Sequence, residues 1–304
     1  MLNIFWFPIR NVIVSRRHAK VAKFWNYKIN KFFNREEIEP ATFIAQNKFE
    51  KPIIWQYWNE DLLHEDLPEV VQRCFDSVDK YKGTYEVIRL HNGNVANYIS
   101  FPDFVWKNNL ESKFSVVFFS DLLRLALLHS YGGVWIDATV LLTKPLIHEY
   151  SNLDHFVFQR DPDEPNKEFW EGPHTAYWSW NPSYRVKMLN SVIFAKKDSV
   201  LIQTMFSLML HYWETQTEVI DYFFFQILYD ELINGEMSHV KPPIVSDILP
   251  HILRVKIYGD SYPISDEELF NKVGMHKLTY LDSEKIARLD QYIMMAAEIL
   301  KSNK

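Results

Sequence analysis

Two side chains of opposite charge stand three positions apart within a strongly apolar stretch. Asp121 and Arg124 belong to Ser120-Asp121-Leu122-Leu123-Arg124, and apolar residues continue to Leu128. Side chains three positions apart share one face of a helix, and a buried charge requires a partner. The pattern predicts a polar site at which Arg124 contacts an anionic or hydroxyl-rich ligand and Asp121 accepts hydrogen bonds from sugar hydroxyls. A surface ion pair is the alternative interpretation.

A third charged residue, Asp137, interrupts the apolar run from Val134 to Leu141. A carboxylate at the end of a buried strand is suited to hold a divalent cation, which neutralises a diphosphate as it leaves. A structural Asp that caps the following turn is the alternative. We therefore expect Asp137 to be a catalytic or metal-ligating residue.

The polar, Pro-rich segment 160–185 is the candidate acceptor site. Long loops that are rich in aromatic side chains often bind ligands, although core packing explains any single Trp equally well. We expect at least one of four residues to contact an acceptor sugar: Trp170, His174, Trp178 and Trp180. Asp221 opens an aromatic helix and is expected either to stabilise that helix N-terminus or to bind a sugar hydroxyl.

These candidates must be positioned by alternating strands and helices. Strands are predicted at 52–58, 85–90, 134–141, 155–159, 191–196 and 254–258, and helices in 67–78, 113–131, 199–215, 218–234 and 283–301. Such alternation predicts an α/β fold whose mostly parallel sheet is flanked by helices, with ligands at the carboxyl ends of its strands.

Composition restricts the class of protein. The chain has 304 residues, 47% hydrophobic and 24% charged, which is typical of a folded globular protein. The single Cys74 excludes an internal disulfide and fits a reducing compartment, so we expect a cytoplasmic protein. The net charge of −6 combines +8 before Glu36 with −14 in the remainder. An acidic body argues against nucleic acid as a partner.

Residues 1–48 are expected to form an arm that associates with an anionic membrane surface. The apolar residues 2–14 are interrupted by a proline and an arginine, so they do not form a transmembrane helix. They also precede the basic residues, whereas in a secretory signal the basic residues come first. A helical wheel over 16–35 separates the basic residues from an apolar face that includes Trp25. Together with Phe5-Trp6-Phe7, this predicts a basic amphipathic helix in the headgroup layer. A helix packed on the body is the alternative.

Three stretches, taken in order, resemble the capsular polysaccharide synthesis proteins of the family 32 glycosyltransferase type. They are Ile53-Ile54-Trp55-Gln56-Tyr57-Trp58, Ser120-Asp121-Leu122-Leu123-Arg124 and Gly132-Gly133-Val134-Trp135-Ile136-Asp137-Ala138-Thr139. The resemblance is clear over residues 50–146, thinner through Asp221-Tyr222-Phe223 and His276-Lys277-Leu278, and does not cover the arm.

The resemblance implies a GT-A-like transferase domain over residues 49–304 that uses a nucleotide diphosphosugar, with a UDP-sugar expected, and retains anomeric configuration. By analogy, Trp55 and Gln56 lie near the nucleotide. The analogy also places Asp121 and Arg124 near the donor sugar, Asp137 near the ribose, sugar or metal, and His276 and Lys277 near the donor phosphates. An exposed pair is the alternative for His276 and Lys277.

The family's Asp-x-Asp motif implies Mn²⁺ or Mg²⁺ at Asp137 and Thr139. Thr139 replaces the second carboxylate, and a neutral hydroxyl is a poor ligand for a hard cation. Either Asp137 holds the ion with water and phosphate oxygens, or the charge is neutralised by Arg124, Lys277 or His276.

We therefore expect a hexosyltransferase, peripheral on the inner face of the cell membrane, that acts on a lipid-linked oligosaccharide in capsular or other surface polysaccharide synthesis. A catalytically silent sugar-binding assembly factor with the same fold is the main alternative. A glycoside hydrolase that uses Asp121 and Asp137 is a weaker one, because Arg124 is expected to keep Asp121 ionised and unfit as an acid.

Overall fold

The computed structural model describes residues 2–41, 45–110, 114–171 and 177–302, with the side chains described from residue 10 onward except at Leu110 and His148. Phe5, Trp6 and Phe7 therefore lie outside the described side chains. The helices are α1 (Leu2–Phe33), α2 (Glu69–Tyr81), α3 (Asp103–Leu110), α4 (Val116–Tyr131), α5 (Lys167–Glu171), α6 (Val200–Thr215), α7 (Phe224–Ile233), α8 (Leu249–Ile257), α9 (Asp266–Lys272) and α10 (Ser283–Ser302). The strands are β1 (Ile53–Tyr57), β2 (Glu86–Leu90), β3 (Gly133–Ile136), β4 (Val140–Leu142), β5 (His155–Phe156), β6 (Val192–Ala195) and β7 (Met275–Lys277). Short 3₁₀ helices occur at His64–Asp66, Val95–Asn97, His148–Asn152 and Ser238–Val240.

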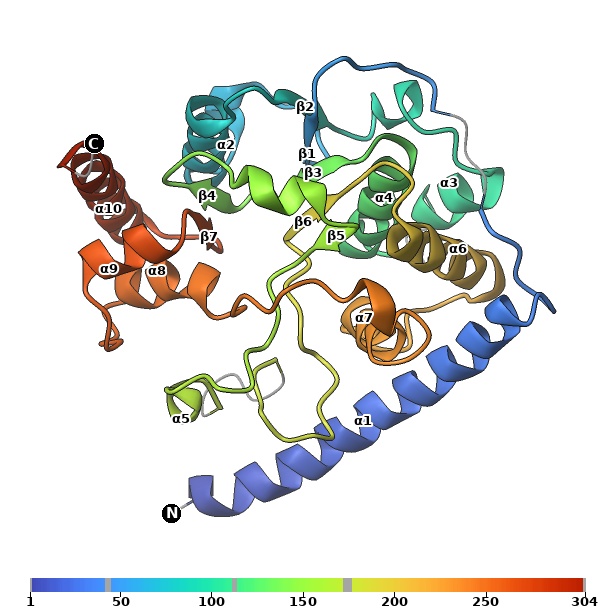
Figure 1. Ribbon diagram of the computed structural model, residues 1–304. Coiled ribbons are helices and arrows are strands. Elements are labelled where there is room, and N and C mark those ends of the chain that lie inside the picture. Colours follow the sequence, from blue (N-terminus) through green and yellow to red (C-terminus); the bar gives the residue numbers. More distant parts are fainter. Residues whose placement is uncertain (1, 42–44, 111–113, 172–176, 303–304) are drawn as a thin grey trace.

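A central sheet with the strand order β2-β1-β3-β6-β5 organises the chain. Strand β1 runs parallel to both β2 and β3, whereas β6 is antiparallel to β3 and to β5. Strands β4 and β7 form a second, antiparallel sheet. The predicted α/β class, with a parallel-containing sheet flanked by helices, is confirmed (Figure 1). Only β6 runs against the other four strands of this sheet. Its direction was not expected, because residue patterns do not report strand direction.

The two faces of the central sheet carry separate hydrophobic cores. Alternate residues of β1 point to opposite faces, so Trp55 packs with α4, α6 and α7 while Ile54 packs with α2 and α8. In Figure 1, α3, α4, α6 and α7 accordingly lie on one side of the sheet, and α2, α8, α9 and α10 lie on the other. The functional candidates of α4 and β3 are held between these two layers.

Two predicted strands are corrected by the structure. The apolar run 134–141 is not one strand, because a turn at residues 137–139 separates β3 from β4. The strand predicted at 254–258 is wrong, since these residues continue the helix α8. Branched residues in this segment resemble a strand pattern, but Pro250 in the first turn favours a helix, and Leu253 and Ile257 are buried one turn apart.

Helix α1 lies along the body and packs against α7 and α6 (Figure 1). Trp25 has 0% exposure, and its indole Nε1 donates to the Phe224 carbonyl over 2.8 Å. Ile29 is also buried. The face that the sequence assigned to lipid from Val21 to Ile29 therefore packs on protein. The division into an arm and a body at residue 48 stays a prediction.

Within the residues that the structure describes, no helix combines the length and the apolar character needed to cross a membrane.

Candidate functional site

The candidate site is a cleft of about 810 Å³ that opens beyond the carboxyl ends of β1 and β3. Helix α4 forms one wall, while β7 and α8 approach from the other side of the sheet. The lining includes Tyr57, Trp58, Ser120, Asp121, Arg124, Trp135, Asp137, Thr139, Trp178, Asn190, Tyr222, His251, Arg254, Lys277 and Tyr280. Ligand binding at the carboxyl ends of the strands is the general rule for such sheets.

Helix α4 places Asp121 and Arg124 on the cleft wall. Arg124 Nη2 lies 3.2 Å from Asp121 Oδ1, and both side chains are 3% exposed. The guanidinium also donates to Ser120 Oγ over 3.0 Å and to the Asn190 carbonyl over 2.5 Å, and it stacks 4.9 Å from the Trp135 ring centre. These contacts fix the guanidinium plane, so Arg124 is a preorganised cation at the site.

The ionisation of Asp121 differs from the expectation. Burial raises its pKa to about 6, and Arg124 and an Asn190 hydrogen bond only partly oppose that effect. At pH 7 the carboxyl is still mostly ionised, as the argument against a hydrolase assumed, but it takes up a proton at a higher pH than an ordinary Asp. Desolvation outweighs the ion pair, because both groups are almost entirely removed from water.

Gly132 and Gly133 connect α4 directly to β3. Both have positive φ, 71° and 99°. A Cβ on Gly132 would lie 2.4 Å from the backbone nitrogen of Lys197, and a Cβ on Gly133 would lie 2.3 Å from the backbone oxygen of Ile53. Only glycine fits this passage between β1 and β6. The joint sets the register of β3 and hence the position of Asp137 at its end.

Asp137 sits in the turn between β3 and β4. Its amide donates to the Ser191 carbonyl over 2.9 Å, and its carbonyl accepts from the Val140 amide, so it closes the turn as the structural alternative expected. Its carboxylate also faces the cleft with 22% exposure and accepts from Trp135 Nε1 over 2.8 Å. Asp137 therefore both shapes the turn and presents a charge to a ligand.

Lys277 of β7 reaches across to this turn. Its Nζ donates to Asp137 Oδ2 over 2.9 Å and to Thr139 Oγ1 over 2.7 Å. Burial opposes the ionisation of Asp137, but Lys277 and Arg124 together outweigh it and lower the pKa of that carboxyl to about 2. Asp137 is thus an anion at every physiological pH.

The residues around Asp137 do not fit Mn²⁺ or Mg²⁺ as they are arranged. Mg²⁺ is commonly held by one or two carboxylates together with water and substrate phosphates, but here the one carboxylate and the neighbouring hydroxyl are both already bonded to the Lys277 ammonium. Within the described residues, no three or more His, Cys, Asp and Glu side chains are grouped to hold a metal. A divalent ion about 4 Å from that ammonium would meet a repulsion of about 8 kcal/mol at an effective dielectric constant of about 20. The metal at Asp137 and Thr139 stays a prediction.

Three residues that the resemblance assigned to the donor lie away from the cleft. Trp55 is buried, and its Nε1 donates to the Gly132 carbonyl over 3.0 Å. Gln56 is buried on the opposite face of β1 and accepts from Arg89 Nε over 3.1 Å. His276 is 0% exposed and pairs with Thr143, because neighbours of Lys277 in β7 point to the other side. Burial, with Lys144 nearby, lowers the pKa of His276 to about 3.

The acceptor candidates are scattered. Trp178 lines the cleft, whereas Trp170 packs in the core beneath it, 4.8 Å from Trp178 between ring centres. Asp221 forms an ion pair with Arg17 of α1, so its carboxylate joins the arm to the body. His174 lies outside the described residues.

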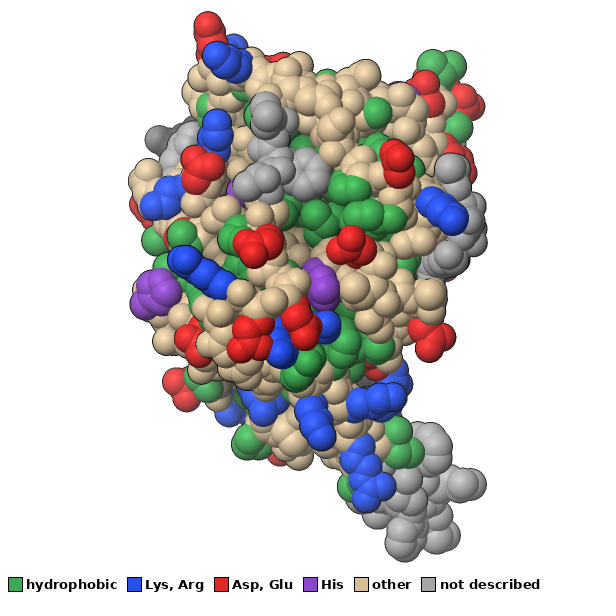
Figure 2. Space-filling model, turned by 90° about the vertical axis from the view of Figure 1, so that its right-hand side faces the viewer, with side chains coloured by type: hydrophobic (Ala, Val, Ile, Leu, Met, Phe, Trp, Pro, Cys, Tyr) green, Lys and Arg blue, Asp and Glu red, His purple; other side chains and the backbone are tan. Residues whose placement is uncertain are grey.

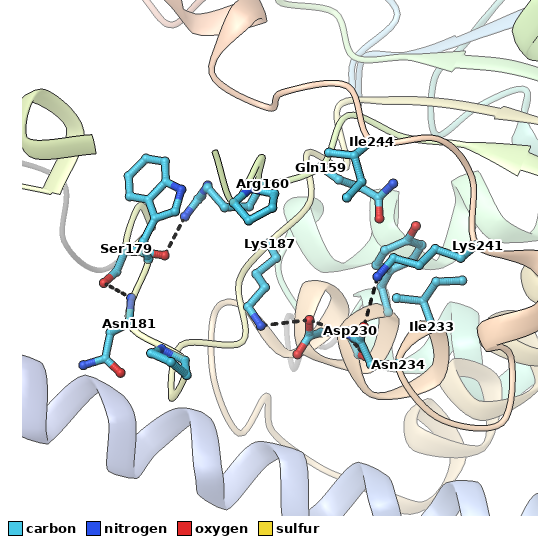
Figure 3. Close-up of a pocket in the computed structure, with 14 residues that line it drawn as sticks. Gln159, Arg160, Ser179, Asn181, Lys187, Asp230, Ile233, Asn234, Lys241 and Ile244 are labelled. Carbon is cyan, nitrogen blue, oxygen red and sulfur yellow. Dashed lines mark hydrogen bonds and ion pairs between the residues drawn. The ribbon is translucent and has the colours of Figure 1, made fainter. Parts of the chain in front are cut away.

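Trp180 lines a second, smaller cavity of about 270 Å³, shown in Figure 3. Polar side chains surround this cavity, and Lys187 pairs with Asp230 across it. Arg160 forms a buried ion pair with Asp247 and also donates to the Ser179 carbonyl over 3.0 Å. The bond from Arg160 to Ser179 holds the backbone between Trp178 and Trp180, which line different cavities.

Several cleft residues were missed by sequence reasoning. Tyr57 and Trp58 end the first strand and line the cleft in place of Trp55 and Gln56. The rule that ligands bind beyond the carboxyl ends of strands could have identified them. Arg254 also lines the cleft, but its segment was taken as a strand. Asn190, which donates to Asp121 over 3.0 Å, carries no local sequence signal.

Comparison with known proteins finds a family, a relative and a solved structure to which this chain is similar. A family model described as "Capsular polysaccharide synthesis protein" matches residues 6–295. Glycosyltransferase afumC of Aspergillus fumigatus (strain CBS 144.89 / FGSC A1163 / CEA10) is 26% identical over 180 residues, which are 54% of this chain and 41% of that protein. The chain thus spans about two fifths of the length of this relative. The solved PaToxG glycosyltransferase matches with a TM-score of 0.37 and 15% identity, over 94% of this chain and 97% of that chain.

Proposed function

Since the chain belongs to the capsular polysaccharide synthesis protein family, we propose that it is a glycosyltransferase that moves a hexose from a nucleotide diphosphosugar to a glycan acceptor. The observation that supports this most is the joining of Asp121, Arg124, Asp137 and Lys277 in one cleft. Fixed anions that accept hydrogen bonds from sugar hydroxyls and fixed cations that face a diphosphate are what glycosyl transfer from such a donor requires.

In this reaction the bond between the sugar C1 and the diphosphate oxygen breaks, and its electron pair stays on that oxygen. The acceptor hydroxyl oxygen forms the new bond to C1, and its proton passes to the departing diphosphate. This transfer on one face of the sugar retains the anomeric configuration. Asp137 and Asp121 hold and orient the donor sugar, while Arg124 and Lys277 stabilise the charge that develops on the leaving group.

The donor base is proposed to contact Tyr57 and Trp58 at the end of β1. Both residues line the cleft, and an aromatic side chain stacks on any base, so the contact is compatible with the proposed UDP-sugar as donor. Trp55 and Gln56 lie within β1 and do not line the cleft. Trp55 packs in the core, and Gln56 accepts a hydrogen bond from Arg89 of β2. Their effect on the donor is therefore indirect.

The acceptor is proposed to enter along an aromatic rim. Tyr222 and Tyr280 are 56% and 67% exposed at the edge of the cleft, and Val116 and Val117 of α4 are exposed beside them. Exposed aromatic rings at a cleft mouth suit the apolar faces of sugar rings, and adjacent branched aliphatic groups suit a lipid carrier. A lipid-linked oligosaccharide fits this combination, with Trp178 at the inner end of the rim.

An anionic membrane surface, on the cytoplasmic side, is proposed to bind the outward face of α1. Arg16, Lys20 and Lys23 are exposed at helical spacing, and they form no ion pair within the described part of the chain. Ile13 and Tyr27, 49% and 53% exposed, flank them. Figure 2 shows Lys and Arg side chains gathered at the height of α1, toward the lower end of that face. A surface helix of this kind binds anionic lipid without crossing the bilayer.

Charge reversal tests this surface without disturbing the buried face of α1. The variant Arg16→Glu/Lys20→Glu/Lys23→Glu should bind anionic vesicles at least about a hundredfold more weakly in co-sedimentation, since each basic residue contributes about 1 kcal/mol. The matched control reverses three lysines of the body, Lys51, Lys197 and Lys272, which are also exposed. Equal loss in both variants would contradict a site on α1.

The catalytic proposal is tested with the full chain and a panel of nucleotide sugars. The correct donor should raise the unfolding temperature, because a ligand at about 100 times its dissociation constant adds about 2.7 kcal/mol of stability. It should also release nucleoside diphosphate when acceptor is supplied. Stabilisation without turnover would support the silent sugar-binding factor, a role that the neutral Thr139 favours. Cleavage of polysaccharide without any nucleotide would support the hydrolase.

A further inference from the structure

The ammonium of Lys277 occupies the space between the two ends of the Asp-x-Asp-like motif. Its Nζ is 2.9 Å from Asp137 Oδ2 and 2.7 Å from Thr139 Oγ1. The antiparallel pairing of β4 with β7 sets this position, since Lys277 lies opposite Val140, the residue that follows the motif. An ammonium has three donors, and the side chain keeps 21% exposure in the cleft. One donor is therefore left for a ligand.

The charges at this position are already matched. A pair of carboxylates suits a divalent cation, whereas a single carboxylate beside a neutral hydroxyl is balanced by one ammonium. Thr139 serves this arrangement as a hydrogen-bond acceptor for Lys277 and not as a ligand for a hard ion. Thr139 and Lys277 thus form a consistent pair, because a second carboxylate would bring excess negative charge next to a single ammonium.

A second cation lines the same cleft. Arg254 of α8 lines the cleft, and α8 packs directly against β7, which carries Lys277. Arg254 Nε is buried without a hydrogen-bond partner, and its guanidinium forms no ion pair among the described residues. The side chain is held by Tyr258, whose ring centre is 5.3 Å from the guanidinium carbon. An unpaired buried donor in a cleft that also presents the Lys277 ammonium indicates an anionic ligand.

We propose that Lys277 replaces the divalent cation at this site and that, together with Arg254, it binds the donor diphosphate directly, so that transfer proceeds without a metal ion. This inference rests on the proposed function, because it concerns the diphosphate of the same donor. When the C1–oxygen bond breaks, the electron pair remains on the diphosphate oxygen, and the two side chains supply the positive charge there. The acceptor hydroxyl oxygen takes its place on C1, and the hydroxyl proton passes to the diphosphate.

The experiment measures the affinity of the full chain for inorganic pyrophosphate, UDP and GDP by calorimetry, in a chelator and in Mn²⁺. Native affinity should agree within about twofold between the two conditions, since the protein supplies the cations. In the chelator, Lys277→Met should weaken binding at least about tenfold, and Arg254→Met by a smaller factor of about five, as expected for loss of a charged contact. Lys272→Met, a lysine outside the cleft, is the matched control and should bind as the native chain does.

A pair of variants at Thr139 separates replacement of the metal from simple charge attraction. Thr139→Asp alone should still bind UDP in the chelator, because Lys277 neutralises the added carboxylate. Thr139→Asp/Lys277→Ala has two carboxylates and no ammonium, so its binding should require Mn²⁺. Should Lys277→Met fail to fold by circular dichroism, Lys277→Arg keeps a cation and should retain binding in the chelator.

Opposite outcomes would overturn the inference. Loss of native UDP binding in the chelator with recovery in Mn²⁺ would show that a metal is required. Native affinity of Lys277→Met in the chelator would show that Lys277 does not bind the diphosphate. Either result leaves the proposed transferase intact. Failure of every nucleotide sugar, UDP, GDP and pyrophosphate to bind in both conditions contradicts the proposed function as well. Binding of diphosphate without metal, but with no transfer to any acceptor, leaves the diphosphate site of Lys277 and Arg254 intact and contradicts the proposed transfer.

Discussion

Two pairs, each made of a carboxylate and a cation, face the same cleft, and the pKa values of the two carboxyl groups are shifted in opposite directions. On the α4 side, Asp121 beside Arg124 has a pKa raised to about 6, because burial outweighs the attraction of the guanidinium. On the β4 and β7 side, burial also opposes the charge of Asp137, but Lys277 and Arg124 lower its pKa to about 2. The difference follows from exposure and from the number of cations near each carboxylate. Asp137 has 22% side-chain exposure and two cations, while Asp121 has 3% and one.

This contrast separates the two residues in function. A carboxylate that stays ionised offers a constant charge to a sugar or to a cation, whereas one with a pKa near 6 changes charge within the range in which cells live. Arg124 belongs to both pairs, 3.2 Å from Asp121 and 3.6 Å from Asp137. It therefore couples the two sides of the cleft.

The largest expected effect is on turnover when either charge is removed. Asp137→Asn and Asp121→Asn should each lower the rate of transfer at least about a hundredfold, because each removes an electrostatic contact at the donor and not a packing group. Initial rates at saturating donor measure this. Far-ultraviolet circular dichroism is the control for folding. A folded variant with native turnover would remove that residue from the site.

Arg124→Lys tests the coupling of the two sides. An ammonium cannot reproduce the planar contacts to Ser120, Asn190 and both carboxylates. Turnover should fall about thirtyfold, equivalent to about 2 kcal/mol. Lys277→Arg offers the comparison, since it keeps a cation at a position where no planar contact is made. Equal tolerance of both changes would show that only charge matters.

The free energy of unfolding at pH 7 should fall more for Asp137→Asn than for Asp121→Asn. Ionised Asp137 stabilises the fold above its unfolded pKa, and that stability is lost as pH falls from about 4 to about 2, so Asp137→Asn should cost about 2 kcal/mol. Ionised Asp121 destabilises the fold as pH rises from about 4 to about 6. Asp121→Asn removes this cost, but it also leaves the buried Arg124 with only one of its two carboxylates, so the two effects oppose each other and the net change is the smaller one.

Denaturant titration of both variants at pH 7 measures these changes. A larger loss of stability in Asp121→Asn than in Asp137→Asn would mean that the ion pair with Arg124, and not burial, dominates at Asp121.

The smallest effect is on the pH dependence of the rate. If the reaction uses ionised Asp121, native turnover should fall about tenfold between pH 7 and pH 5 with an apparent pKa near 6. The residual rate of Asp121→Asn should lack this change, while that of Asp137→Asn should keep it. A flat native profile over this range would show that Asp121 does not titrate in the working enzyme.

The two regions also differ in how far the sequence could predict them. Asp121 and Asp137 were identified because a charge within an apolar run must face a polar site, a rule that needs only local sequence. The elements that carry them, α4 and β3, were predicted for the same reason. Lys277 was suggested by resemblance alone, since its contact with Asp137 depends on the pairing of β7 with β4 across 140 positions of the chain.

The errors have physical causes as well. Trp55 and Gln56 lie within β1, where neighbouring side chains enter the two cores, and only the residues at the strand end reach the cleft. Trp25 was assigned to lipid because a helical wheel reports an apolar face but not what covers it; here α7 does. Arg254 was not predicted as a cleft residue, because a short segment with branched residues fits a strand or a helix equally well.

The glycine joint between α4 and β3 has a consequence for related chains. Neither Gly132 nor Gly133 tolerates a Cβ, and no residue can be added between them and Asp137 without rotating that side chain to the opposite face of the sheet. The thirteen positions that separate Arg124 from Asp137 are therefore a constant length. In relatives that keep this cleft, insertions and deletions should occur before Ser115 or after Thr143. Such relatives should therefore align with this chain without gaps from the start of α4 to the end of β4.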